Sequence, residues 1–196
     1  MTTASWAERE PIDPLAAWSV VLVRTQGPIN LGMILRACAN TGLQDLRLVQ
    51  TLCAPDCDDA RKFANHARDR LASLPLHPDL GSALHDRDLV IGTSGRPRDP
   101  AHGRALDLRE LPALIRDRGA QRPALVFGNE ADGLDDGELA HCQVYVHLPT
   151  PGDYPSYNLS HAVAICLFQL VQMAVPLPRV DDPQADMDDR ERLIGY

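Results

Sequence analysis

Short apolar runs alternate along this chain with longer segments whose apolar residues recur at helical spacing. The runs that indicate strands cover residues 18–24, 45–50, 88–93, 123–128 and 143–148. The segments that indicate helices cover residues 29–40, 58–74, 108–118, 135–141 and 159–174. Continuous apolar runs are typical of strands buried on both faces. Because the two kinds alternate, the sequence predicts an α/β fold, a parallel sheet flanked by helices and joined by right-handed crossovers.

The length of the chain suits a single domain. A chain of 196 residues can bury one α/β core and is short for two. We assign that domain to residues 18–175. Residues 1–17 and 176–196 are rich in proline and acids and poor in apolar periodicity. We therefore expect a flexible N-terminal extension and an acidic C-terminal tail.

Several functional classes lose support from composition. No apolar run approaches the roughly 18 to 20 residues that a membrane span needs, and the N-terminus carries acids instead of a basic stretch. We expect a cytoplasmic protein with no membrane partner. Five cysteines are an odd number, and without a CxxC pair they argue against a disulfide scaffold. Cys53 and Cys57 with His66 lack a fourth ligand at zinc-like spacing, so no metal is expected.

The segment after the first predicted strand, residues 25–32 (TQGPINLG), could hold an anion. Gly27 and Gly32 permit tight or left-handed backbone, and the following helix offers free N–H groups. Asn30 and Arg36 are close enough along the chain that both could face one pocket above the sheet. From local sequence alone, an N-cap asparagine and a surface arginine are the simpler interpretation.

Small or polar residues also end the third and fourth predicted strands. Thr93, Ser94 and Gly95 follow one of them, and Gly128 and Glu130 follow the other. Ligands of open parallel sheets bind at the carboxyl ends of strands, where small residues let the backbone approach them. An ordinary turn explains the first group nearly as well, and a first-turn acid explains Glu130.

The loop over residues 148–160 (LPTPGDYPSYNLS) leads into the last predicted helix. It contains Ser156 and Asn158, two residues apart. Either Asn158 or Ser160 can cap the helix that follows. The cap alone would account for these residues.

Taken in order, residues 30–36, 127–134 and 156–160 resemble the three signature motifs of the SPOUT-superfamily RNA 2′-O-ribose methyltransferases, the TrmH/TrmJ-like class. The resemblance covers residues 18–173. It implies a SPOUT-type parallel sheet with a C-terminal deep trefoil knot, in which the 148–160 loop cradles S-adenosyl-L-methionine. It also implies methyl transfer from this cofactor to a ribose 2′-hydroxyl of RNA, with tRNA expected and rRNA possible, by a homodimer.

The same resemblance assigns residues to roles. The catalytic residues it implies are Arg36, Asn30, Glu130, Ser156 and Asn158. The cofactor-binding residues it implies are Thr93, Ser94, Gly95, Gly128, Leu148, Ser156, Tyr157 and Asn158. Arg36 is expected to contact phosphate and to help deprotonate the ribose hydroxyl, while Asn30 organises its loop. Tyr157 departs from the family, in which leucine is commoner at this position, and so alters packing beside the pocket.

Charge neither supports nor excludes an RNA partner. The net charge is −8, but part of the acid excess lies in the two ends. All basic residues except Lys62 are arginine, which forms planar bidentate contacts with phosphate. The loop over residues 96–104 is basic and suited to an RNA backbone, although a solvated loop is equally compatible. A genomic bias toward arginine is another sufficient explanation.

Two further functional classes stay open. The first alternative is a non-catalytic RNA-binding knot protein that acts in RNA or ribosome assembly. The second is a small α/β domain that binds a nucleotide or phosphate. The chain has neither GxGxxG after its first strand nor GxxxxGK[ST], which disfavours the second alternative. All of the polar motif residues are present, and this favours the enzyme over the non-catalytic RNA-binding protein. They are Asn30, Arg36, Glu130, Ser156 and Asn158.

Overall fold

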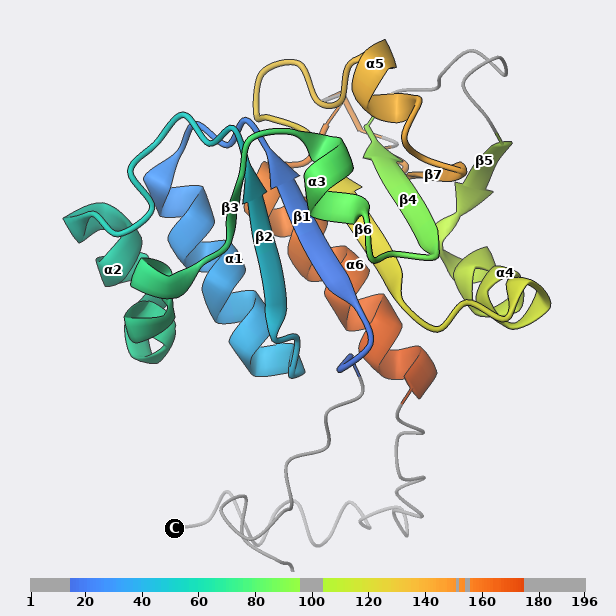
Figure 1. Cartoon of the computed structure of the whole chain (residues 1–196), viewed down its shortest axis with the longest axis horizontal. Coiled ribbons are helices and arrows are strands. Elements are labelled where there is room, and N and C mark those ends of the chain that lie inside the picture. The colour runs from blue at the N-terminus through green and yellow to red at the C-terminus, as the bar shows by residue number, and fades with distance from the viewer. Residues whose placement is uncertain (1–14, 96–103, 151, 154–155, 175–196) are drawn as a thin grey trace, which may run out of the picture.

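The described part of the chain forms one seven-stranded parallel sheet with helices on both faces (Figure 1). The computed structural model describes residues 15–95, 104–150, 152–153 and 156–174. The strands are β1 Ser19–Val23, β2 Asp45–Val49, β3 Leu76–His77, β4 Leu89–Ser94, β5 Arg104–Asp107, β6 Pro123–Phe127 and β7 Val144–His147. Their order in the sheet is β3-β2-β1-β6-β4-β7-β5, and every pair is parallel. The predicted α/β class is confirmed.

The helices bury both faces of this sheet. They are α1 Pro28–Thr41, α2 Asp58–Ala64, α3 Leu80–Leu84, α4 Leu111–Arg118, α5 Asp136–Leu139 and α6 Leu159–Ala174, with 3₁₀ turns η2 Asn65–Ser73 and η4 Leu108–Glu110. One face packs against α1 and α6, with α2 and η2 beside α1 and α4 near the β5 edge, and the other packs against the short α3 and α5 (Figure 1). In β1, Val20 and Leu22 face the first layer, while Val21 and Val23 face the second. Burial on both sides explains why the strands are apolar throughout.

The predicted elements lie close to the observed ones, with two corrections. The predicted helix over 58–74 ends at Ala64, because Asn65 takes a left-handed φ of 53° and the chain continues as a 3₁₀ turn. The pattern also misses β3, β5 and α3, which are too short to show periodicity. Of the predicted basic loop, residues 96–103 lie outside the described residues, and Arg104 begins β5.

Gly32 has a different role from the one predicted. It lies inside α1, which begins at Pro28, and a Cβ on it would lie 2.4 Å from the carbonyl oxygen of Ala60. The missing side chain therefore lets α2 pack directly on α1. The glycine that takes the left-handed conformation is instead Gly42, with φ 81°, at the C-terminal end of α1.

The described part of the chain begins at a core residue. Leu15, inside the predicted N-terminal extension, is buried in the core, and its carbonyl accepts a hydrogen bond from the Trp18 N–H. None of the helices in the described ranges is long and apolar enough to cross a membrane.

The strand order determines where a site can form. Neighbouring strands β1, β6, β4 and β7 are far apart in sequence, yet their carboxyl ends share one edge of the sheet. The segments that leave those four strands therefore meet. They carry all three polar motifs.

Candidate active site

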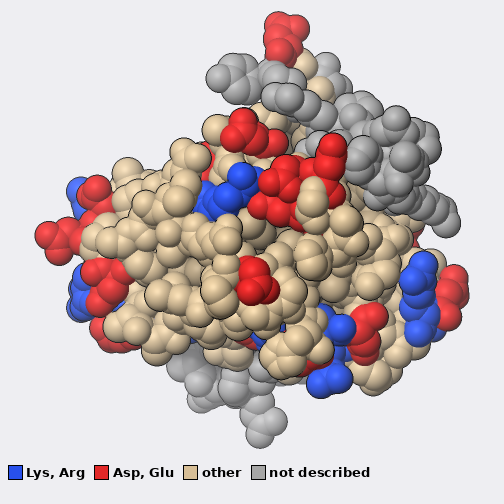
Figure 2. All heavy atoms as spheres, turned by 45° about the horizontal axis from the view of Figure 1, so that its top comes forward, with Lys and Arg blue, Asp and Glu red and all other residues tan. Residues whose placement is uncertain are grey.

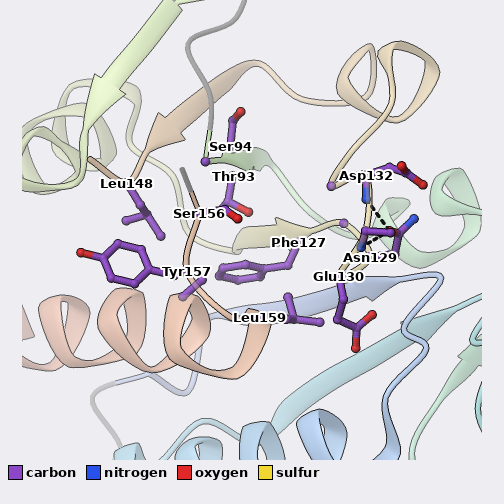
Figure 3. Close-up of a pocket in the computed structure, with 15 residues that line it drawn as sticks. Thr93, Ser94, Phe127, Asn129, Glu130, Asp132, Leu148, Ser156, Tyr157 and Leu159 are labelled. Carbon is purple, nitrogen blue, oxygen red and sulfur yellow. Dashed lines mark hydrogen bonds between the residues drawn. The ribbon is translucent and has the colours of Figure 1, made fainter. Parts of the chain in front are cut away.

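A cavity of about 250 Å³ opens at this edge of the sheet. Its lining comes from the ends of β4, β6 and β7 and the start of α6, namely residues 93–95, 127–133, Leu148, 156–157, Leu159 and Ala162. Figure 3 shows Phe127, Tyr157 and Leu159 along the side nearest α6. The cavity thus combines an apolar wall with hydroxyl groups and backbone.

Most of the predicted cofactor-binding residues line this cavity. The lining includes Thr93, Ser94, Gly95, Gly128, Leu148, Ser156 and Tyr157. Thr93 is fixed by its own hydroxyl, which donates to the Val126 carbonyl at 3.0 Å. Asn158 is not part of the lining and makes its contacts with α1 and α6 instead.

The segment after β6 folds back tightly over Gly128. A Cβ on Gly128 would lie 2.0 Å from the carbonyl carbon of Gly133 and 2.2 Å from the nitrogen of Leu134, so only glycine fits. Gly133 itself has a φ of 72°. The Asn129 Oδ1 accepts hydrogen bonds from the Ala131 and Asp132 N–H groups, both at 2.8 Å (Figure 3). The side chain at 128 is therefore excluded by the protein's own backbone, whatever ligand the cavity holds.

Glu130 ties this segment to the one that follows β1. Its carboxylate accepts hydrogen bonds from the N–H groups of Gln26 and Gly27, both at 3.0 Å, and from the Asn30 Nδ2 at 2.9 Å. Its side chain points away from Thr93 and toward the β1–α1 segment (Figure 3). Burial raises the pKa of the Glu130 carboxyl, but these hydrogen bonds outweigh burial and lower the pKa below its ordinary value.

Asn30 extends the connection to the third motif. The Asn158 Nδ2 donates to the Asn30 Oδ1 at 3.0 Å, while the Asn158 Oδ1 accepts from the Ser160 N–H and hydroxyl at 2.9 and 2.7 Å. Asn158 therefore caps α6, as its sequence position suggested. Asn30 is not a cap, because α1 begins at Pro28 with Gly27 as its N-cap residue.

The structure does not bring Arg36 to the cavity of its own chain. Arg36 is exposed on α1 and is not part of the lining. Arg36 is six positions after Asn30, which at about 3.6 residues per turn places the two side chains on different sides of the helix. The expectation that both face one pocket fails for this reason within a single protomer.

Sequence reasoning passed over four residues that build the site. Asn129 and Gly133 shape the turn around Gly128, and Asp132 lines the cavity. The GNEADG stretch contained a signal for them, since asparagine and glycine are typical of tight turns. Arg24 also contacts this turn, donating from its Nη2 to the Gly133 carbonyl at 3.4 Å. An arginine directly after a strand gives no such signal.

The metal-ligating side chain types in the described residues are scattered. Across them, no group of three or more His, Cys, Asp or Glu side chains is arranged to hold a metal ion. The cysteines of that part of the chain are all free, and burial raises the pKa of the Cys38 and Cys166 thiols to about 12.

The chain thus combines a parallel α/β sheet with a cavity at its carboxyl edge, which is lined by the segments that follow β4, β6 and β7. The model of the SpoU rRNA Methylase family matches residues 17–168. The chain belongs to that family, and the resemblance to SPOUT RNA methyltransferases is confirmed.

Relatives and solved structures agree with this membership. The chain is 33% identical to tRNA (cytidine-2′-O-)-methyltransferase TrmJ of Methanocaldococcus jannaschii over 90% of this chain and 77% of that protein. It is 32% identical to the uncharacterized tRNA/rRNA methyltransferase LasT of Escherichia coli, over 89% and 76%. The crystal structure of TrmJ from Z. mobilis is 25% identical, with a TM-score of 0.72 over 90% of this chain and 76% of that one.

Proposed function

We propose that this chain transfers a methyl group from S-adenosyl-L-methionine to a ribose 2′-hydroxyl of RNA, with tRNA as the substrate. The observation that carries the proposal is the hydrogen-bonded line Glu130–Asn30–Asn158, which joins the three motifs beside the cavity. The names of the TrmJ relatives specify 2′-O-methylation of cytidine or uridine in tRNA, and this favours tRNA over rRNA.

The residues around the cavity fit S-adenosyl-L-methionine. Phe127, Leu148 and Leu159 offer an apolar surface for an adenine ring, while Thr93 and the backbone of residues 128–133 offer polar groups for the ribose and methionine parts. The cofactor, when bound, supplies an electrophilic methyl group. We further propose that residues 148–160 pass through the loops after β4 and β6 as the deep trefoil knot of the SPOUT fold.

The protein's own groups then have separate tasks. Glu130 holds the β1–α1 segment in place, since both of its carboxylate oxygens accept hydrogen bonds and its lowered pKa keeps it ionised. A carboxylate engaged in this way is a poor general base. Arg36 supplies the cation that contacts phosphate and favours ionisation of the 2′-hydroxyl, for which its planar guanidinium is suited.

We propose a two-fold homodimer that brings Arg36 to a cavity. Large apolar side chains are exposed on adjacent helices, with Ile29 on α1 at 42%, Ile165 on α6 at 37% and Phe168 on α6 at 61%. Pairing through this face would bury these side chains. It would also place Arg36 of one protomer near the cavity of its partner. Arg36 could then act at a cavity although it lies outside the one in its own chain.

We propose the following division of the chain. Residues 18–175 would form the methyltransferase domain, with an N-terminal extension before it and an acidic tail after it. A tRNA substrate would be met in the cytoplasm, and we propose that location.

The direct test is to incubate the purified protein with S-adenosyl-L-methionine and unmodified tRNA, and to map ribose methylation by mass spectrometry. The expected product is a 2′-O-methylated nucleotide at a defined position. Cofactor binding without transfer to tRNA or rRNA would favour the non-catalytic RNA-binding alternative.

A further inference from the structure

Arg24 occupies an unusual position at the edge of the site. It directly follows β1 and takes a left-handed φ of 53°, which non-glycine residues rarely adopt. Its N–H donates to the Val49 carbonyl at 2.8 Å, so the backbone here is tied to the end of β2. Such backbone strain often marks functional positions.

The Arg24 side chain crosses to the segment that follows β6. Its Nη2 donates to the Glu138 Oε2 at 2.9 Å and to the Gly133 carbonyl at 3.4 Å. Its Nε lies 2.9 Å from the Glu138 Oε1, although it is not aligned for a hydrogen bond. The side chains of Arg24 and Glu138 are only 28% and 13% exposed, so solvent screens this pair less than a surface pair.

One of these contacts is to the cavity wall itself, and the other is to the helix that follows it, α5. Gly133 is the residue whose backbone closes over Gly128, and residues 128–133 line the cavity. Glu138 is fixed in turn by its capping box with Asp135, at the start of α5. Arg24 therefore holds the far end of the segment, while Glu130 holds its near end to Gln26 and Gly27.

Figure 2, in which the top of Figure 1 comes forward, shows acidic groups gathered near this edge beside basic ones. The segment carries four acids within seven residues, namely Asp132, Asp135, Asp136 and Glu138. Like charges at this spacing repel, and the Arg24 guanidinium offsets part of the repulsion through Glu138 and through Asp135, whose Oδ2 lies 3.6 Å away.

We infer that Arg24 is a positioning residue for cofactor binding, which sets residues 128–133 in the shape that S-adenosyl-L-methionine requires. The inference rests on the proposed function. Arg24 is not itself part of the cavity lining, so it acts through Gly133 and Glu138. The simpler view is that this ion pair stabilises the fold and has no selective effect on the ligand.

Calorimetry with S-adenosylhomocysteine separates the two views. Arg24→Met removes the charged hydrogen bonds and should weaken binding about tenfold or more, because residues 128–133 lose the anchor at their far end. Arg24→Gly loses the same side chain but relieves the left-handed backbone. Its midpoint of urea unfolding should therefore exceed that of Arg24→Met, while its affinity stays equally low. If Arg24 only stabilised the fold, the more stable Arg24→Gly variant should also bind S-adenosylhomocysteine more tightly than Arg24→Met.

A coupling measurement and a matched control complete the test. Glu138→Gln should weaken binding similarly, and the Arg24→Met/Glu138→Gln double variant should be no worse than the weaker single variant. Arg61→Met breaks another ion pair, with Asp56 at 2.6 Å, on α2 and away from the cavity, and should leave affinity unchanged. In turnover, the Arg24 variants should raise the KM for S-adenosylmethionine more than they lower kcat.

The outcomes distinguish this inference from the proposed function. Wild-type protein that does not bind S-adenosylhomocysteine would overturn both. Wild-type protein that binds while Arg24→Met binds equally well would overturn the inference alone. So would an affinity for Arg24→Gly that returns to the wild-type value.

Discussion

Asn30 and Asn158 are 128 positions apart in the chain, yet the amide of one donates to the carbonyl oxygen of the other at 3.0 Å. This contact joins the start of α1 to the start of α6. Because Asn158 also caps α6 through Ser160, one side chain fixes both the helix and the β1–α1 segment. The polar motifs of this chain thus hold each other in place, in addition to any contact with substrate.

Asn158→Ala should lower both stability and methyl transfer. Loss of the cap costs about 0.5–2 kcal/mol, and loss of the bond to Asn30 loosens the first motif. Asp79→Ala is a matched control, since Asp79 caps α3 by accepting from the Ser82 N–H at 2.7 Å, away from the cavity. Urea unfolding should show comparable losses for the two variants, while tRNA methylation should fall only for Asn158→Ala. Equal activity in the two would contradict the role of this bond.

Glu130→Gln should change how stability depends on pH. The pKa of Glu130 is lower in the folded protein than its ordinary value, so the ionised carboxylate stabilises the fold above roughly pH 4.3, the unfolded pKa. That contribution should disappear as the pH falls through the lower, folded pKa. Unfolding measured between pH 3 and pH 7 should therefore give wild type an advantage over Glu130→Gln that shrinks in acid. A difference independent of pH would exclude this linkage.

Gly128→Ala should abolish S-adenosylhomocysteine binding by disrupting the segment itself. The added methyl group would lie within 2.2 Å of the backbone at Gly133 and Leu134, which cannot move without reshaping the cavity. Gly81→Ala, in α3, meets its nearest atom at 3.4 Å and serves as the control. Calorimetry should find binding lost in the first variant and retained in the second. Normal binding by Gly128→Ala would show that this part of the cavity is dispensable.

Arg36→Ala should cut methyl transfer at least roughly 10²-fold while leaving S-adenosylhomocysteine affinity nearly unchanged, because Arg36 lies outside the cavity. Arg36→Lys should restore little, since a point charge does not reproduce the planar fork. Co-expression of differently tagged Arg36→Ala and Gly128→Ala chains tests whether the arginine acts across a dimer. One site of the mixed dimer would then combine an intact cavity with an intact arginine and recover activity. An inactive mixed dimer would mean that Arg36 acts within its own chain.

Phe168→Asp should convert the proposed dimer into a monomer. The side chain is 61% exposed in the single protomer, so a charge there should not disturb the fold. Light scattering at micromolar concentration should give a dimer mass for wild type and a monomer mass for the variant. Circular dichroism should be the same for both. A monomeric wild-type protein would rule out the proposed pairing.

The sequence predicts those helices and strands that are long enough for their apolar spacing to be detected. In the predicted apolar stripe of the last helix, Leu159, Val163, Cys166, Leu167 and Leu170 are buried as expected. The edge strands β3 and β5 have only two and four residues, too few for a pattern to differ from a turn.

The site is predictable only in part, for physical reasons. Gly128 and Ser156 follow from motif resemblance, and both line the cavity. The relation between Arg24 and Glu138 depends on a pairing 114 positions apart and on a left-handed arginine, neither of which local propensity encodes. Whether Arg36 faces the cavity of its own chain depends on where it falls around the helix. Whether it faces the cavity of a partner depends on how two protomers pair, and the spacing of residues in one chain contains no information on that.

The strand order also has a consequence during synthesis on the ribosome. The first 150 residues include every strand of the sheet, and Glu130 could already meet Gln26 and Gly27. The cavity would still lack Tyr157, Leu159 and Ala162, which arrive with the last helix. A nascent chain therefore cannot capture its ligand until almost all of the domain has been translated, so that ligand binding reports completed folding.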